Sequence, residues 1–230
     1  MIALLLLALD ASPSAAQIRD SETCYSINRM VDGETRPIGV TWQSVKHDRI
    51  DGVDVLRVVV HQRGAGGRFD MRDAFVLRAD TLQPITFENT RSGALHVSLR
   101  YEDGRVVGRR IDDGVEKAVD VALPTPVWEG NLYGVMFAGL PLAEGATFQL
   151  PYYQYDKGVS AFDLRVTGSE VVATPEGPVD AWAVEVTTGA DVRITYLIAR
   201  EGGRELGYRG QSFNQVMGGD CSEITGAPAA

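Results

Sequence analysis

The chain of 230 residues carries 22 Lys and Arg against 31 Asp and Glu, a formal net charge of −9, and 44% of its residues are hydrophobic. This length corresponds to one domain or two small ones and allows a sizeable core without a metal or a dense set of disulfides. The acidic balance argues against nonspecific nucleic-acid binding, which needs a positive surface, so we expect no nucleic-acid partner.

The N-terminal residues have the pattern of a secretory signal. An uninterrupted apolar run over residues 2–9 is too short to cross a bilayer, which takes about 20 residues. The small residues Ser14-Ala15-Ala16 follow, at the positions that a signal peptidase reads. We therefore predict a signal peptide over residues 1–16, a periplasmic or otherwise exported protein, and no transmembrane segment in the mature chain. A buried N-terminal strand or helix is the alternative.

Two cysteines, Cys24 and Cys221, lie near the two ends of the expected mature chain. In an exported protein two cysteines usually pair, so we predict a disulfide that closes nearly the whole domain. Lipidation of Cys24 is less favoured, because a lipoprotein cysteine follows its apolar run within a few small residues, whereas Ser21-Glu22-Thr23 precede this one. A metal site with two cysteines and no nearby histidine is less favoured still.

The body of the chain alternates apolar and polar residues with period two. Clear examples are residues 95–101, 162–166, 182–186 and 192–198, and Asp-Gly and Gly-Gly pairs suited to tight hairpins lie between the segments. This pattern predicts an antiparallel meander with one wet face. No linker or internal repeat divides it, so we expect a single β-rich domain over residues 17–224 and a frayed tail over 225–230.

Residues 128–140 break the alternation. Their apolar side chains recur at helical offsets, and prolines flank the segment, which predicts one helix laid across the sheet. Core packing of Trp128 and Met136 is the favoured interpretation, and the lining of an apolar pocket is the alternative. The apolar positions are Trp128, Leu132, Val135, Met136 and Leu140.

Patterns that would indicate catalysis or metal binding are missing from the sequence. The three histidines share no metal-ligand spacing, and the segment around Ser212 lacks the final glycine of a nucleophile elbow. We therefore predict a protein that is not an enzyme, with no catalytic residues, no cofactor and no metal.

Asp73 is an exception to the alternation. It shares the phase of Phe75 and Leu77, so its carboxyl group is expected to point toward the apolar side of the sheet. An arginine partner, or a bulge that turns the residue outward, would offset the cost of burying it.

Three segments resemble an exported bacterial family, domain of unknown function 3108. The resemblance covers roughly residues 50–210, in the same order along the chain. The segments are Leu77-Arg78-Ala79-Asp80-Thr81-Leu82-Gln83-Pro84, Leu140-Pro141-Leu142-Ala143-Glu144-Gly145, and residues 166–177 with the following strand that holds Trp182 and Glu185.

The resemblance implies an architecture similar to LolA and LolB, the lipoprotein carriers of the bacterial envelope. We accordingly expect a mainly β fold: a single strongly curved antiparallel sheet, or half barrel, with one helix packed on its concave side. The carriers have several helices around an apolar cavity, and this chain has one clear candidate. The family has no established catalytic residues, so the resemblance implies none here.

Two functions are compatible with these expectations. The first is a non-catalytic module that binds a lipid or other hydrophobic small molecule in the half-barrel groove. The second is a structural or protein-interaction domain of the envelope, with a filled core and an envelope protein as its partner. The expected groove residues are Phe75, Phe87, Leu99, Phe162, Trp182 and Tyr196, with Trp128 and Met136 of the helix over them.

Overall fold

The computed structural model describes residues 12–123, 126–188 and 192–225. The apolar run of the predicted signal peptide and nearly all of the predicted tail lie outside the described residues. The strands are β1 (Ser21–Val31), β2 (Glu34–Ile50), β3 (Val53–Gly64), β4 (Asp70–Arg78), β5 (Pro84–Arg91), β6 (Ala94–Glu102), β7 (Arg105–Asp112), β8 (Val115–Ala122), β9 (Trp128–Glu129), β10 (Thr147–Gln154), β11 (Gly158–Thr174), β12 (Gly177–Thr188), β13 (Val192–Ala199), β14 (Glu205–Arg209) and β15 (Phe213–Met217), and the helices are η1 (Ala15–Gln17), η2 (Ala65–Gly67) and α1 (Gly134–Ala138).

All fifteen strands belong to one sheet, in the order β8-β7-β6-β5-β4-β3-β2-β1-β15-β14-β13-β12-β11-β10-β9. Neighbours pair antiparallel, except that β9 runs parallel to β10. The chain therefore runs as two meanders joined where β1 pairs with β15. The predicted mainly β, antiparallel fold is confirmed, and the sheet is not closed into a barrel, because β8 and β9 are its edges.

Tight hairpins connect most of these strands, as the Asp-Gly pairs predict. Asp32 and Gly33 have φ values of 53° and 79°, and Asp51 and Gly52 have values of 49° and 82°. Two consecutive residues with positive φ form the turn whose twist matches that of the flanking strands. The local sequence thus places the β1–β2 and β2–β3 connections directly.

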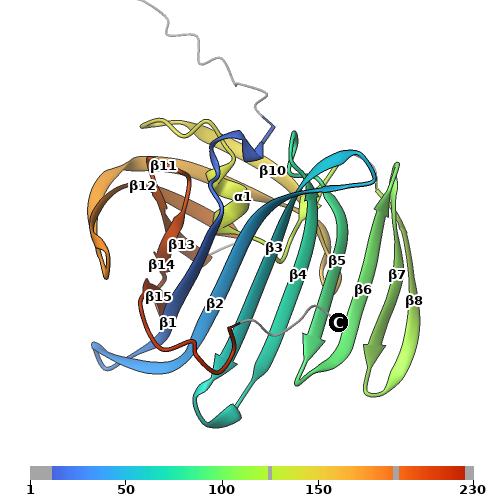
Figure 1. The fold of residues 1–230 in the computed structure, drawn as a ribbon, viewed down its shortest axis with the longest axis horizontal. Helices are drawn as coiled ribbons and strands as arrows, with labels where there is room; N and C mark the ends of the chain where they lie inside the picture. Colours follow the sequence, from blue (N-terminus) through green and yellow to red (C-terminus); the bar gives the residue numbers. More distant parts are fainter. Residues whose placement is uncertain (1–11, 124–125, 189–191, 226–230) are drawn as a thin grey trace, which may run out of the picture.

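The sheet turns back on itself, so that β10–β13 lie behind β1–β5 with α1 between them (Figure 1). Side chains, not a backbone ladder, connect β9 to the far strands. The indole Nε1 of Trp128 donates to the carbonyl oxygen of Thr81 at 2.9 Å, and the Tyr101 hydroxyl donates to Glu129 Oε2 at 2.5 Å. We use the term seam for the zone where residues 128–131 and the β10–β11 turn contact strands β5–β7 and the β4–β5 turn.

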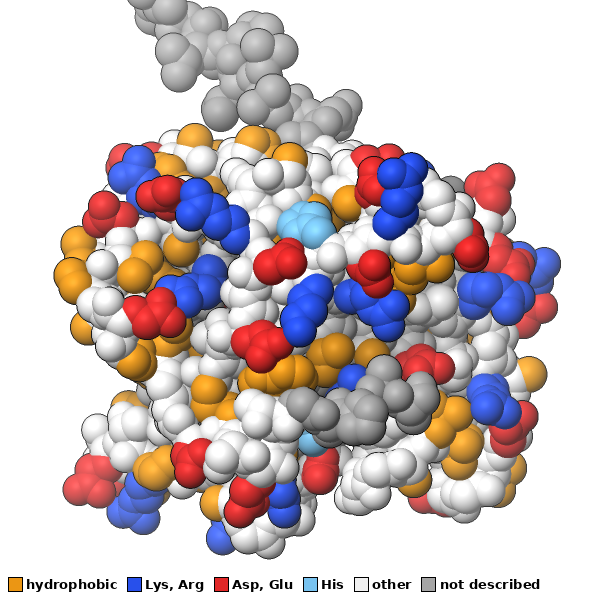
Figure 2. All heavy atoms as spheres, viewed as in Figure 1, with side chains coloured by type: hydrophobic (Ala, Val, Ile, Leu, Met, Phe, Trp, Pro, Cys, Tyr) orange, Lys and Arg blue, Asp and Glu red, His pale blue; other side chains and the backbone are white. Residues whose placement is uncertain are grey.

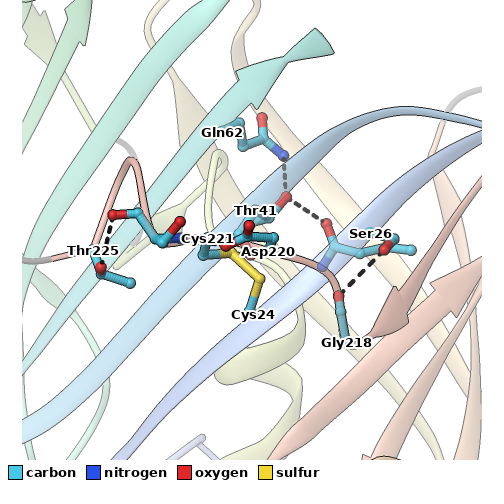
Figure 3. The surroundings of a disulfide bond; sticks show 10 residues. Cys24, Ser26, Thr41, Gln62, Gly218, Asp220, Cys221 and Thr225 are labelled. Atoms are coloured by element: carbon cyan, nitrogen blue, oxygen red, sulfur yellow. Dashed lines mark hydrogen bonds between the residues drawn. A yellow bond between two sulfur atoms is a disulfide. The ribbon is translucent and has the colours of Figure 1, made fainter.

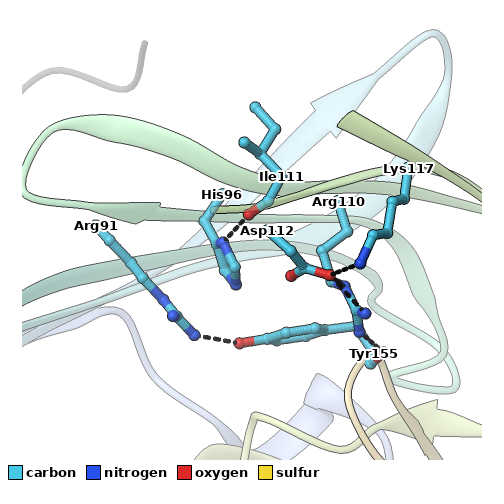
Figure 4. Close-up of polar contacts among 7 residues, drawn as sticks. All are labelled: Arg91, His96, Arg110, Ile111, Asp112, Lys117 and Tyr155. Carbon is cyan, nitrogen blue, oxygen red and sulfur yellow. Dashed lines mark hydrogen bonds and ion pairs between the residues drawn. The ribbon is translucent and has the colours of Figure 1, made fainter. Parts of the chain in front are cut away.

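A second set of seam contacts surrounds Tyr155, in the turn between β10 and β11 (Figure 4). Arg91 of β5 donates to the Tyr155 hydroxyl at 3.0 Å, and Arg110 of β7 donates to the Tyr155 carbonyl oxygen at 3.1 Å. Asp112 holds Arg110 in place through an ion pair of 2.7 Å. The seam therefore encloses an interior without a continuous ladder of hydrogen bonds.

The predicted helix over residues 128–140 is wrong in extent. Trp128–Glu129 forms strand β9 against β10, and only Gly134–Ala138 is helical. Glycines account for the difference, because they favour helix poorly and allow close approaches. A Cβ atom on Gly130 would lie 2.5 Å from the ring of Tyr152, so only glycine lets the chain leave β9 beside β10.

The predicted disulfide is confirmed: Cys24 and Cys221 are bonded, with their Cα atoms 5.9 Å apart (Figure 3). It fixes the C-terminal segment on the outer face of β1–β3. There Cys221 and Ile224 pack against Trp42, and all three are buried. The amide of Gly218 also donates to the carbonyl oxygen of Cys24 at 2.8 Å.

The outer surface carries both signs of charge side by side. Figure 2 shows acidic and basic side chains interspersed over the face in view. Many form exposed ion pairs, such as Arg63 with Glu223 at 3.1 Å, which contribute little stability each. Within the described ranges, no helix has both the length and the apolar character needed to cross a membrane.

Candidate functional site: an interior cavity

The expected groove residues form a packed core. Of the eight, seven are at most 8% exposed. Their rings are in contact: Phe75 stacks on Phe87 with centroids 5.1 Å apart, and Phe162 stacks on Tyr152 at 4.1 Å. We use the term apolar layer for the part of the interior that these seven residues form: Phe75, Phe87, Leu99, Trp128, Met136, Phe162 and Tyr196.

Trp182, the eighth, lies at the margin of the apolar layer. It is half-buried and packs against the core, and the guanidinium of Arg200 lies over its ring, 4.4 Å from the centroid. A cation over an indole face is attracted by the ring quadrupole, so this pair covers the outer side of the ring.

Further along the same strands, the inward positions become polar. On β4 and β5, Phe75 pairs with Phe87, and two residues on, Asp73 pairs with Asn89. Because strand side chains alternate, positions two apart face the same side, so Asp73 and Asn89 point inward like the phenylalanines. We call these inward side chains the polar layer; it comprises Thr41, Gln43, Gln62, Asp73, Asn89, Gln154, Glu205 and Gln215.

A cavity of about 300 Å³ lies within the polar layer. This is the lower end of the range for small-molecule sites. Its lining includes the acids Asp73 and Glu205 and the exposed Asp156, and no Lys, Arg or His side chain belongs to it among the described residues. The rest of the wall comes from Val60, Met71, Asn131, Leu132, Tyr133, Gly134, Tyr155, Tyr196 and Tyr208.

Asp73 points into this cavity, on the side of the sheet that its phase predicts. Its partner is neither of the expected ones: Asn89 Nδ2 donates to Asp73 Oδ1 at 2.6 Å. Burial raises the pKa of Asp73 to about 6, against the opposing effect of the Asn89 hydrogen bond and of Arg91 and Arg72 nearby. An amide neighbour thus makes an inward carboxyl tolerable without an ion pair.

Glu205, at the start of β14, is the most buried acid of the cavity wall. It is 5% exposed and accepts one hydrogen bond of 3.2 Å from Gln43 Nε2. Burial raises its pKa to about 7. Gly134 makes room for it, because a Cβ atom there would lie 2.2 Å from Glu205 Oε2.

Glu129 is a third buried acid, and it belongs to the seam. Besides the Tyr101 hydroxyl, it accepts hydrogen bonds from the Asn131 backbone amide at 3.1 Å and from Asn131 Nδ2 at 2.7 Å. Burial raises its pKa to about 7, with these donors opposing the shift. Gln154 Nε2 donates to Asn131 Oδ1 at 3.0 Å, so the same asparagine links the seam to the cavity wall.

A second hollow of about 480 Å³ adjoins the cavity. We call it the vestibule. Four residues line both spaces: Gln62, Tyr133, Tyr196 and Tyr208. The outer wall of the vestibule is more apolar, with Val186, Ile194 and Phe213, and it also contains Arg193. The two hollows together form a polar interior with an apolar approach.

The residues of this arrangement are suited to hydrogen bonding and to charge interactions. The wall offers carboxyl, amide and phenol groups. No cluster of three or more His, Cys, Asp or Glu suited to a metal occurs in the part of the chain that the structure describes. His61 Nε2 lies 2.8 Å from Asp70 Oδ1. In the β3–β4 ladder His61 is opposite Arg72, not opposite an inward residue, and it lies outside the cavity wall.

Of the residues that line the cavity, the sequence analysis named Tyr196 as a groove residue and expected Asp73 to point toward the same side of the sheet without giving it a role. It missed Glu205, because β14 is too short to show alternation, and it missed the amides. A usable signal was present: Gln43 lies two residues from Val45, and Asn89 two residues from Phe87, so both are in apolar phase. Polar residues in that phase on successive strands indicate a polar interior.

Comparisons with known proteins bear on the fold and family. Residues 24–218 match the family model described as "Protein of unknown function (DUF3108)". A crystal structure of a beta-barrel-like protein of domain of unknown function DUF1849 from Brucella abortus is similar to this chain, with a TM-score of 0.51, 13% identity, and coverage of 85% of this chain and 95% of that chain. At this identity the likeness shows the fold alone. No curated protein matches. The expected likeness to LolA and LolB stays a prediction.

Proposed function

The chain belongs to the DUF3108 family, and from this premise we propose that it is an exported, non-catalytic protein of the cell envelope that binds a small amphipathic molecule in its interior. The observation that carries the proposal is the pair of adjoining hollows, one polar and one more apolar. Sites for small molecules combine apolar walls with a few placed polar groups, as this one does.

The division of the interior determines how such a molecule would lie. The expected groove residues are packed against one another, so they leave the apolar layer filled. A ligand's apolar part therefore belongs in the vestibule, against Ile194 and Phe213, and its polar group belongs in the cavity. Tyr196 is the groove residue that keeps a role in binding, since it lines both hollows.

Export is supported by the disulfide and by the N-terminal pattern. Disulfides persist in oxidising compartments such as the periplasm. The Gln17 side chain donates to the carbonyl oxygens of Leu140, at 2.8 Å, and of Ala138. A chain cut after Ala16 would keep these anchors at its new N-terminus and would lose the backbone hydrogen bonds of Ser14 to Gly139 and of Ala15 to Ala79. N-terminal sequencing of protein from the periplasmic fraction is expected to begin at Gln17, and a full-length cytoplasmic product would contradict export.

Binding is tested with octyl compounds that differ in head group: octylamine, octanol and octanoate. Calorimetric titration of the oxidised protein is expected to show saturable one-to-one binding of at least one of them. Replacing Ile194, which lines the vestibule, by Trp fills the approach and is expected to weaken that binding at least tenfold. Val171→Trp is the matched control, because Val171 is 66% exposed and lines neither hollow.

The competing function is a structural or interaction domain that holds no ligand. The filled apolar layer is the observation that favours it. Absence of saturable binding for all three compounds, in protein that is folded and oxidised, would remove the binding proposal and favour this alternative.

A further inference from the structure

We infer that the polar group of the ligand is a positively charged amine, held by Asp73 and Glu205. This inference rests on the proposed function and names the chemical class of ligand that the same cavity would bind. It follows from three independent features of the wall: its charge, the direction of its hydrogen bonds, and its aromatic faces.

The charge of the wall has one sign. Asp73 and Glu205 lie on different strands, β4 and β14, and both line the cavity together with Asp156. The arginines near Asp73 are engaged elsewhere or lie outside the wall: Arg91, for example, donates to the Tyr155 hydroxyl. Buried carboxyl groups that line one cavity favour a cation there, since no basic side chain belongs to the described wall.

The hydrogen bonds of the described wall leave one buried side-chain acceptor without a partner. Asn89 Nδ2 is used by Asp73, and Gln43 Nε2 is used by Glu205. In contrast, the Asn89 Oδ1 atom is buried with no hydrogen-bond partner among the described residues, although Asn89 is only 1% exposed and lines the cavity. Buried polar atoms are normally paired, so an unpaired acceptor beside a carboxyl group indicates a ligand that donates. An ammonium group has three donors and no acceptor.

Aromatic rings lie where the vestibule and the cavity adjoin. Tyr133 and Tyr196 are stacked with centroids 6.0 Å apart, and Tyr208 lies 5.4 Å from Tyr196. All three line both hollows. The faces of such rings attract cations, whereas an anionic head group gains nothing from them. The same rings can also pack against an apolar chain, so both the charged group and the chain of an alkyl amine match these walls.

The ionisation of the two acids agrees with this geometry. Burial without a cationic partner in contact raises the pKa of Asp73 to about 6 and that of Glu205 to about 7. A bound ammonium group would supply the opposite charge that burial lacks, and would stabilise both carboxylates.

The test uses the three octyl compounds at about pH 8, where an alkyl amine is protonated, much like a lysine side chain. Octylamine is expected to bind wild-type protein at least tenfold tighter than octanol, because charge-assisted hydrogen bonds are stronger than neutral ones. Octanoate is expected to bind more weakly than octanol. Asp73→Asn and Glu205→Gln are each expected to abolish the preference for amine over alcohol.

A matched control is available on the surface. Asp163 accepts a hydrogen bond from Gln149 Nε2 at 2.8 Å, as Asp73 does from Asn89, but it is exposed and lines neither hollow. Asp163→Asn is therefore expected to keep the full preference. Thermal melts establish that each variant is folded, and if Asp73→Asn does not fold, Glu205→Gln and the three-compound comparison on wild type carry the test.

The outcomes separate this inference from the proposed function. If octanol or octanoate binds as tightly as octylamine, the charged-amine inference is overturned and the proposed function stands. If the preference persists in both Asp73→Asn and Glu205→Gln, the assignment to these two acids is overturned. If none of the three compounds binds, both the inference and the proposed function fall.

Discussion

The apolar and polar layers are built from the same strands, yet they have opposite chemistry. On β4, Phe75 belongs to the first and Asp73 to the second, and on β5 the same is true of Phe87 and Asn89. Alternation along a strand determines to which face of the sheet a side chain points, but it does not determine whether the interior on that face is apolar or polar. The comparison shows that stability and recognition can be separated along one strand by a single pleat.

The two layers differ in energy as well as in composition. Burying an aromatic side chain contributes a few kcal/mol, in proportion to the apolar area removed from water. Burying a carboxyl group costs free energy unless it is hydrogen-bonded, and Glu205 has one donor in its carboxyl environment. A fold that keeps such groups inside gives up stability there, which is expected of binding sites and not of cores.

The largest expected effect concerns the apolar layer. Phe87 is fully buried and stacks between Phe75 and Tyr155. Phe87→Ala is expected to lower the free energy of unfolding by about 3–5 kcal/mol, because it leaves a cavity that the neighbouring strands cannot fill. Chemical denaturation measures this. Val115→Ala, at a 59% exposed position, is the control and is expected to change stability by less than about 0.5 kcal/mol. A loss below about 1 kcal/mol for Phe87→Ala would mean that this layer is not a packed core.

The disulfide lies outside both layers and gives the next largest effect. Cys24 and Cys221 are 197 residues apart, so the bond restricts nearly the whole unfolded chain. Replacing both by Ser is expected to cost about 2–5 kcal/mol. Since the bond faces away from the cavity, binding of octyl compounds to folded protein should stay the same. A change in that affinity would show that the C-terminal segment influences the polar layer.

The polar layer is expected to make stability depend on pH. The folded-state pKa of Glu205 is about 7, above its ordinary value of 4.5, so the folded protein holds this proton more tightly than the unfolded chain. The unfolding free energy therefore falls as pH rises from about 4.5 to 7, by an amount on the order of 3 kcal/mol, and the loss persists above pH 7.

Glu205→Gln tests this dependence directly. Gln carries no charge at any pH, so the variant is expected to be more stable than wild type at about pH 8 and to show a shallower decline between about pH 5 and 7. Part of the decline is expected to persist, because Asp73 and Glu129 also have raised pKa values. Glu116→Gln, at an exposed position, should reproduce the wild-type curve. Identical slopes for wild type and Glu205→Gln would contradict burial of a titrating carboxyl group.

The sequence predicts the apolar layer, because its residue types follow the alternation of apolar and polar positions. It does not predict the polar layer, where polar residues occupy inward positions. The strands and the hairpins follow from local patterns, and the disulfide follows from the number of cysteines and the expected compartment. The extent of α1 does not, because the approach of Gly130 to Tyr152 and of Gly134 to Glu205 depends on distant strands. Asp73 was the one polar residue of the cavity whose inward direction the sequence indicated. A single glutamine in apolar phase carries little information until several strands are placed side by side.

The smallest expected effect tests the residue that joins the two layers. Tyr155 stacks on Phe87 of the apolar layer, lines the cavity, and accepts a hydrogen bond from Arg91 across the seam. Tyr155→Phe keeps the ring and the carbonyl that binds Arg110 and removes only the hydroxyl, so the unfolding free energy is expected to fall by about 0.5–1.5 kcal/mol. Tyr208→Phe is the control: Tyr208 also lines the cavity, and its hydroxyl makes no hydrogen bond with the described residues. Because Tyr155 belongs to the seam, loss of its hydroxyl is expected to increase the rate of amide hydrogen exchange more at the β10–β11 turn than in β4. Equal effects from the two substitutions would mean that the hydroxyl contact does not fasten the seam and that ring packing alone holds the layers together.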